Sequence, residues 1–356
     1  MSPKRHFFFK IEKTGYIFIL ISIGIGLSAL NSGNNILYFI FSTMMMFLLI
    51  SGILSTQNLK GLKIKIEFPN YIFAQRTAYL KIKILNKKRL FPSFSIKLNV
   101  KVKGLEDGNE FLLYVGRKKK EEVLSSKFFP RRGLWKITGY YIASTFPFNL
   151  FERKRFVEME EEIIVYPKIV DLFPHLPDEV FSLGEIPSKS KGYEEDFFGL
   201  RDWQEEDDKK YIHWKISAKK GKLIIKELTQ PKKSFITLIV DPYLSELSGS
   251  KGEIQFEENI SLCASLAYYF FNLKIPYKLL TFGYESDFDT SESHFWDNLK
   301  ALALLKVCGK ESINLLEEFS RKISVENSIP ILFSVEKDSP LRKNVQKYYE
   351  ILPKRA

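Results

Sequence analysis

One stretch limits the possible folds more than any other: residues 14–59 contain no charged side chain. A helix needs about 20 predominantly apolar residues to cross a bilayer, so this run is long enough for two spans. The polar segment NSGNN at residues 31–35 lies between them and supplies the Asn and Gly that tight turns favour. The sequence therefore predicts a transmembrane hairpin with spans at residues 15–30 and 36–54.

Basic residues flank this hairpin on both outer sides, and the connecting turn has none. By the positive-inside rule, both termini are expected in the cytoplasm, as in a multi-pass protein of the inner (cytoplasmic) membrane. A cleaved signal peptide is the alternative, because it also begins with basic residues before an apolar core. A second apolar span follows directly, which favours the hairpin. The flanking residues are Lys4, Arg5, Lys10 and Lys13 before it and Lys60, Lys63 and Lys65 after it.

The net charge of +12 is distributed unevenly along the chain. Residues 61–157 carry 22 Lys and Arg against 7 Asp and Glu, whereas residues 158–356 carry 27 against 34. Each basic side chain near an anionic leaflet gains up to about 1 kcal/mol, so contact with the lipid bilayer explains the basic block. Nucleic-acid binding is the alternative for a basic domain, but no motif of that class is present.

The pattern after the hairpin changes twice. Alternating apolar and charged residues, as in LKIKIEF and FSIKLNVKV, predict a β-sandwich over residues 60–170. Residues 171–233 are interpreted as a linker, rich in Pro, Gly and Ser, followed by a segment dense in charged and aromatic residues. From residue 234 onward, buried strands such as SFITLIVD alternate with helices, which predicts an α/β domain with a mostly parallel sheet.

Cysteine and histidine usage indicates neither a disulfide framework nor a zinc site. Cys263 and Cys308 lie in apolar helical contexts and are expected to be core thiols. The four histidines show no metal-ligand spacing.

The segment GLRDWQEEDDKKYIHWKISAKKGKLIIKE, residues 199–227, has the side chains of an active site. We expect a helix over residues 209–220, capped by Asp207 or Asp208 and ended by Gly221, with a strand after it. His213 and Ser217 are four residues apart, so a nucleophilic serine with a histidine base is one hypothesis. No nucleophile-elbow motif is present, and a mid-helix serine lacks nearby oxyanion donors.

Two other interpretations of this segment remain open. In a structural one, Asp and Arg side chains cap helix ends and pair, Trp203 and Trp214 pack, and His213 fills a hydrogen-bonded core niche. In the other, the charged and aromatic side chains form a docking surface for a protein partner.

These residues carry a family resemblance. DFFGLRDWQEEDDKKYIHWKISAKKGKLIIKE resembles the signature of the bacterial membrane-protein family called domain of unknown function fifty-eight, and ALNSGNNILYFIFS, PRRGLW and STFPFNLF resemble its other landmarks. The chain departs from the family pattern at Glu206, where a Gly is usual. The resemblance implies a von Willebrand factor A-like α/β domain and association with a MoxR-type AAA+ ATPase and transglutaminase-like membrane proteins.

A von Willebrand A domain can bind a divalent ion through an Asp-x-Ser-x-Ser motif after its first strand. This chain reads DPYLS, so Asp241 and Ser245 match and Tyr243 replaces the middle serine. Asp287, Asp289 and Thr290 are possible supplementary ligands. Because one ligand is missing, we expect the domain to fold without a metal, and no other cofactor is expected.

The function expected from the sequence is that of a non-enzymatic, membrane-anchored cytoplasmic scaffold or adaptor. Its partner would be the MoxR-type AAA+ ATPase that the resemblance implies, which would perform the energy-consuming step because this chain has no nucleotide-binding loop. The alternative is a hydrolase that uses His213 with Asp207 or Asp208. The candidate partner-binding residues are Arg201, Asp202, Trp203, Asp207, Asp208, His213, Trp214, Ser217, Lys222 and Lys226.

Overall fold

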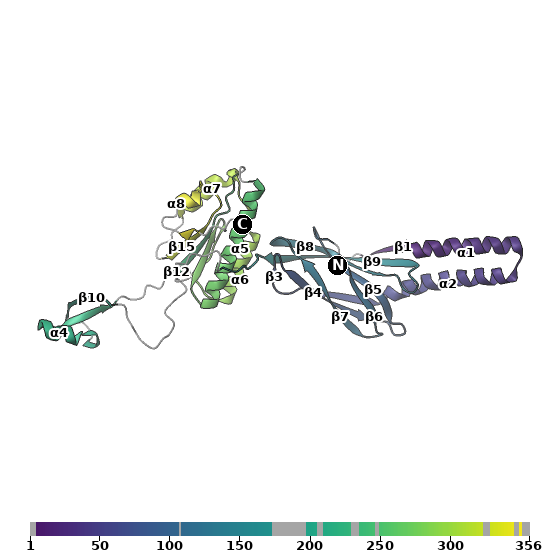
Figure 1. Ribbon diagram of the computed structural model, residues 1–356, viewed down its shortest axis with the longest axis horizontal. Helices are drawn as coiled ribbons and strands as arrows, with labels where there is room; N and C mark the ends of the chain where they lie inside the picture. Colours follow the sequence, from purple (N-terminus) through teal and green to yellow (C-terminus); the bar gives the residue numbers. More distant parts are fainter. Residues whose placement is uncertain are drawn as a thin grey trace. The chain divides into compact units, whose positions relative to one another are not determined.

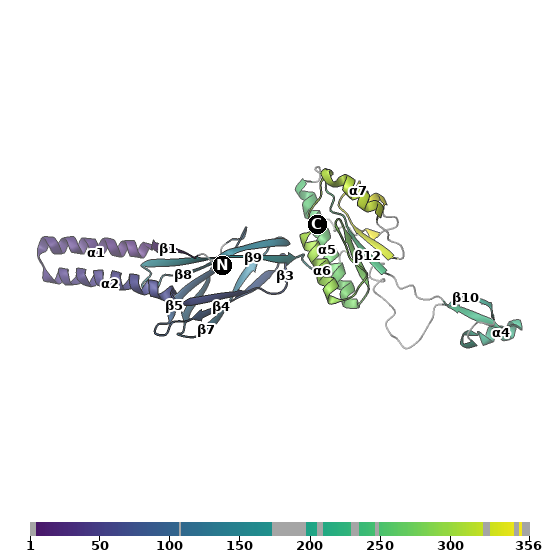
Figure 2. The same ribbon diagram turned by 180° about the vertical axis from the view of Figure 1, so that it is seen from behind.

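The computed structural model describes residues 5–106, 108–172, 197–204, 209–228, 235–245, 249–322, 328–344 and 349–350. The chain divides into two compact units, residues 1–169 with 297–306 and residues 170–296 with 307–356. Figures 1 and 2 show them from opposite sides. Most of the predicted linker, and both Asp207 and Asp208, lie outside the described residues.

Two apolar helices, α1 (Lys13–Ser32) and α2 (Asn35–Leu59), extend beyond the spans predicted from the sequence. Gly33 ends α1 with φ of 63°, a left-handed conformation that glycine adopts at no steric cost. The Asn34 side chain caps α2 by accepting a hydrogen bond from the Ile36 amide at 2.8 Å. Both helices are long and apolar enough to cross a membrane, and they lie side by side in both views (Figures 1 and 2).

The residues before α1 form a strand, which the sequence analysis missed when it treated them only as a basic flank. Strand β1 (Arg5–Ile11) pairs antiparallel with β9 (Phe151–Tyr166), so that Phe9 lies opposite Arg153. The sequence HFFFKI lacks the alternation of a half-buried strand, because β1 is an edge strand whose three phenylalanines are all exposed. Helix α1 therefore leaves a sheet almost directly.

Two sheets build the rest of the first unit, as the alternating pattern predicts. One has the strand order β1-β9-β8-β5-β6, with β3 beside β9, and the other has the order β2-β4-β7. The bounds are β2 Leu62–Glu67, β3 Ile72–Phe73, β4 Thr77–Asn86, β5 Ser93–Val102, β6 Glu110–Val115, β7 Lys120–Phe128 and β8 Gly133–Ser144.

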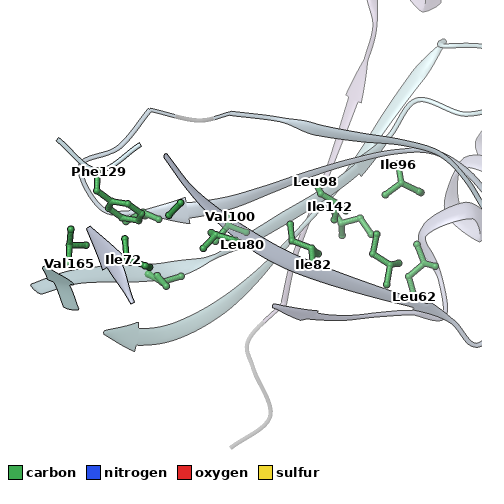
Figure 3. Packing of buried hydrophobic residues seen from close by; sticks show 14 of the residues in the cluster. Leu62, Ile72, Leu80, Ile82, Ile96, Leu98, Val100, Phe129, Ile142 and Val165 are labelled. Atoms are coloured by element: carbon green, nitrogen blue, oxygen red, sulfur yellow. The ribbon is translucent and has the colours of Figure 1, made fainter. Parts of the chain in front are cut away.

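The core between these sheets comes from alternate positions of facing strands. Leu80 and Ile82 of β4 and Ile96 and Leu98 of β5 are each at most 2% exposed (Figure 3). Burial of such a side chain stabilises the fold by roughly 1.5–3 kcal/mol. The shared core joins both sheets into one body.

The end of α2 is fastened to this body by Asn58. Its buried side chain donates to the Phe94 carbonyl and the Ser144 hydroxyl, both at 2.7 Å, and accepts from the Phe94 amide at 2.8 Å. The Lys88 ammonium donates to the main-chain carbonyls of Gln57 and Asn58 and so caps the helix. Burial lowers the pKa of Lys88 to about 8, which leaves it charged at neutral pH.

The second unit contains an α/β sheet with the strand order β14-β13-β12-β15-β16. Strands β12, β13, β15 and β16 run parallel, and the short β14 is antiparallel to β13. The bounds are β12 Phe235–Val240, β13 Tyr277–Thr281, β14 Tyr284–Glu285, β15 Ser328–Phe333, β16 Tyr349–Glu350, α5 Gly249–Leu273, α7 Ile313–Lys322 and α8 Pro340–Asn344. Helix α6 (Glu292–Leu304) begins in this unit, and its residues from 297 onward belong to the first unit.

One face of this sheet packs on α7 through Ile239, Leu332 and Phe319, and α5 lies on the other side (Figure 1). Cys263 in α5 is fully buried, as expected of a core thiol, whereas Cys308 is only half-buried. The predicted mostly parallel sheet is therefore present.

Candidate functional site

The signature segment folds into a small antiparallel element. Strand β10 (Phe197–Asp202) pairs with β11 (Ile224–Leu228), and the chain between them forms the 3₁₀ turn η1 (Lys209–Tyr211) and the short helix α4 (Trp214–Lys220). Gly221 ends α4 in the left-handed conformation and donates its amide to the Ser217 carbonyl, as the sequence predicts. We call residues 197–204 and 209–228 the signature module.

Ser217 fastens α4 to β11. Its buried hydroxyl accepts from the Ile224 amide at 2.9 Å and donates to the Ile224 carbonyl at 3.4 Å. The hydroxyl is thus engaged in both directions by one backbone position. This arrangement suits a structural clamp better than a nucleophile.

The predicted helix over residues 209–220 is too long, and His213 lies outside it. Ile212 forms a β-bridge with Ile225, and the His213 amide donates to the Ile224 carbonyl at 2.8 Å. Ile212 is thereby held in the sheet, and His213 is the N-cap residue of α4, where its carbonyl accepts from the Ser217 amide at 3.0 Å. The His213 side chain is half-buried, not in a core.

The two tryptophans of the module have different environments, and the expected packing is wrong for Trp214. Trp203 is half-buried, and its amide donates to the Leu223 carbonyl at 3.0 Å. Trp214 is the first residue of α4 and is 66% exposed. An exposed tryptophan on a short, anchored helix is typical of a binding anchor.

The sequence on both sides of Trp214 is rich in lysine. Residues 209–228 hold seven lysines and one acidic residue. The exposed ones outside η1 are Lys215, Lys219, Lys220 and Lys222.

Of the other candidate residues, Asp202 accepts an ion-pair hydrogen bond from Lys222 at 2.6 Å, and Arg201 donates to the Asp202 carbonyl at 3.3 Å. The backbone of Lys226 lies in β11 opposite Leu200. The structure thus brings Arg201, Asp202 and Lys222 together.

A second polar cluster lies at the carboxyl edge of the α/β sheet, around Asp241. This residue follows β12 directly and is 1% exposed. Its carboxylate accepts from the Tyr243 amide at 3.0 Å and from the Ser334 hydroxyl at 2.8 Å. Burial raises the pKa of Asp241, and hydrogen bonding to Ser339 partly opposes that rise.

Ser245 reaches the same edge but bonds a different carboxylate. Both its amide and its hydroxyl donate to Glu336, at 2.9 and 2.7 Å. Ser334 links the two halves, since it bonds Asp241 and also the Glu336 carbonyl at 3.1 Å. The two predicted metal residues therefore belong to one hydrogen-bonded network.

This network does not fit a divalent cation. A cation would have to bind the Asp241 oxygens, which already accept N–H and O–H groups of the protein. Tyr243, at the position of the motif's middle serine, contributes its backbone amide to this network. Asp289, the proposed supplement, instead accepts from the amides of Thr290 and Ser291 before α6. Within the ranges given above, no three His, Cys, Asp or Glu side chains form a metal-binding group.

The sequence analysis did not predict Ser334, Glu336 and Ser339, which follow the end of β15 at Phe333. The available signal was their position directly after a buried parallel strand, where polar side chains from neighbouring strands meet.

Comparison with known families finds one match within this region. Residues 199–284 match the family described as "Protein of unknown function DUF58", which supports the family expected from the signature. The matched residues begin in β10 and end in β14.

Two solved structures resemble parts of the chain weakly. The CARDB domain of a Pyrococcus furiosus protein is 14% identical over 30% of this chain and 94% of that one, with a TM-score of 0.22. The sporulation control protein Spo0M of Bacillus subtilis is 10% identical over 41% of this chain and 59% of that one, with a TM-score of 0.19. Neither likeness bears on function, and no curated protein matches the chain.

Proposed function

We propose that this chain is a membrane-anchored adaptor on the cytoplasmic face of the inner membrane, and that its signature module docks a protein partner. One observation carries the proposal: Trp214 is 66% exposed on a helix whose other exposed side chains are mainly lysines. A large apolar anchor surrounded by charges is the composition of a protein-binding surface.

Membrane anchoring is supported by the surfaces of α1 and α2. Leu20, Leu30 and Phe39 are 73%, 71% and 71% exposed, and many other apolar side chains of both helices are exposed as well. Such an apolar surface is unfavourable in water and favourable in the hydrocarbon core of a bilayer.

The α/β unit supports a von Willebrand factor A-like fold. Its first strand, β12, is central, and the next two parallel strands, β13 and β15, lie on either side of it. Strand β14 is a short antiparallel edge. We propose that the partner is the MoxR-type AAA+ ATPase that the family resemblance implies, since the chain itself has no nucleotide loop in its sequence. The lysines of the module fit an acidic patch on that partner.

The hydrolase alternative receives little support from the described residues. The Ser217 hydroxyl is bonded to Ile224, and His213 precedes the first turn of α4 as its N-cap. Asp207 and Asp208 lie outside the described residues, and we propose no catalytic role for them.

Binding of the purified full chain to the ATPase tests the proposal. We expect Trp214→Ala to weaken the affinity about 30-fold, since an interface anchor contributes about 2 kcal/mol. The double variant with Lys219→Glu and Lys220→Glu should also weaken the affinity, and by more at low salt than at high salt, because salt screens exposed charges. Lys251→Glu, an exposed lysine of α5, is the control. Equal affinities for wild type and Trp214→Ala would rule out the module as the docking site.

A further inference from the structure

An open groove of about 460 Å³ lies where α2 approaches the sandwich. Gly52 and Ile53 of α2 form part of its wall, together with Phe9 of β1 and Phe151 of β9. Gln57, one turn after Ile53, and Arg153 of β9 also line it. Along α2 the groove therefore changes from apolar to polar towards the end of the helix.

Arg153 carries a hydrogen-bonding capacity that the surrounding protein leaves unused. Its Nε atom is buried without a hydrogen-bond partner, and its guanidinium carbon lies 4.4 Å from the centre of the Phe9 ring. A buried N–H without a partner costs roughly 1–3 kcal/mol. The groove that Arg153 lines is therefore suited to a phosphate, because the guanidinium group matches phosphate in both charge and geometry.

The apolar part of the groove has room for hydrocarbon. A Cβ atom added at Gly52 would meet no heavy atom within 4 Å. Because α2 is a spanning helix in the proposed topology, lipid chains are the molecules that surround this wall.

Charge on the same unit favours an anionic headgroup. Residues 61–157 carry 22 basic against 7 acidic side chains, and such a surface attracts the anionic lipids of the cytoplasmic leaflet. Phe7 and Phe8 of the edge strand β1 are also exposed, at 73% and 53%, as suits a strand that lies at the membrane surface.

We infer that this groove binds one anionic phospholipid, with its phosphate at Arg153 and an acyl chain along Gly52 and Ile53. The inference rests on the membrane anchoring of the proposed function but not on the docking role of the signature module. Bound lipid would fill the junction between α2 and the sandwich that Asn58 fastens.

Native mass spectrometry of the detergent-solubilised full chain, with equal phosphatidylglycerol and phosphatidylcholine, tests the inference. Wild type should retain phosphatidylglycerol preferentially, and Arg153→Gln should lower that preference about tenfold, as expected for one charge-assisted contact. Lys154→Gln is the matched control, since Lys154 is the next residue of β9 and its ammonium lies over the Tyr141 ring at 3.9 Å.

Gly52→Leu tests the acyl-chain half independently of the arginine, because the leucine would occupy the groove. Its control is Gly24→Leu in α1, where an added Cβ also meets nothing within 4 Å. We expect lipid retention to fall for Gly52→Leu and to be unchanged for Gly24→Leu. Equal retention by all variants, or no preference in wild type, would overturn the lipid site.

Alkaline extraction of membranes separates the two proposals. If the chain stays in the membrane but shows no lipid preference, only the lipid site fails. Release of the chain by alkali would overturn the anchoring, and the lipid site with it.

Discussion

Ser217 and Asp241 are residue types common in catalytic and metal sites, but here their side chains form hydrogen bonds that hold the fold together. The Ser217 hydroxyl bonds both backbone groups of Ile224, and the Asp241 carboxylate accepts from Tyr243 and Ser334. Both side chains are buried. Their environments explain why these residue types occur there, and each leads to a measurable prediction.

Ser217→Ala should destabilise the signature module, because it leaves the buried Ile224 amide without its acceptor. We expect a loss of roughly 1–3 kcal/mol in the local free energy of opening, measured by hydrogen exchange of the Ile224 amide. Ser261→Ala is the control, since the exposed Ser261 hydroxyl bonds only the Glu257 carbonyl of its own helix. Unchanged exchange at Ile224 would contradict the clamp.

Asp241 should make stability depend on pH in a specific direction. Burial raises its pKa in the folded chain, whereas the unfolded chain has a pKa of about 3.9. The folded state then holds the proton more tightly, so ionisation costs stability as the pH rises above about 4. Relative to Asp241→Asn, which cannot ionise, wild type should lose free energy of unfolding in urea as the pH rises from about 4 through the raised pKa of the folded chain. Parallel pH profiles would refute this.

At the scale of elements, the end of α2 is joined to the sandwich by Asn58. Asn58→Ala would leave the Phe94 amide and the Phe94 carbonyl without that partner in a buried site. We expect the melting temperature to fall and protease cleavage near residues 55–60 to increase, with a cost of about 2–3 kcal/mol. The neighbouring Gln57→Ala removes an exposed side chain and should have little effect. Similar losses from both variants would contradict a specific role for Asn58.

Elements with a clear period were predicted from the sequence, and those fixed by distant partners were not. The alternation of FSIKLNVKV predicts β5, and the uncharged run predicts α1 and α2. Strand β1 has no such period because its pairing with β9 lies about 150 residues away in the sequence.

The candidate site follows the same rule. Gly221 was predicted as the end of a helix from local chemistry alone. The start of α4 was not, because Ile212 pairs with Ile225 of a strand and sheet contact overrides helical propensity. The bond of Ser245 to Glu336 joins residues 91 apart, so no local pattern signals it.

For the whole molecule, the proposed topology places the turn between α1 and α2 on the outer side of the membrane. Asn34→Cys should be labelled by an impermeant maleimide on intact cells, whereas Glu160→Cys, an exposed site in β9, should be labelled only after permeabilisation. Background should be low because Cys263 is buried and Cys308 half-buried. Labelling of Glu160→Cys on intact cells would reverse the orientation.

The central claim is that Trp214 meets a protein partner at the membrane. A photo-crosslinking amino acid placed at position 214 of the full chain in native membranes tests it most directly. Position 79 is the control, since Tyr79 in β4 is 60% exposed, close to the 66% of Trp214. We predict that position 214 crosslinks to the MoxR-type AAA+ ATPase and position 79 does not. No protein crosslink at 214, or equal capture of the ATPase from both positions, would contradict the account.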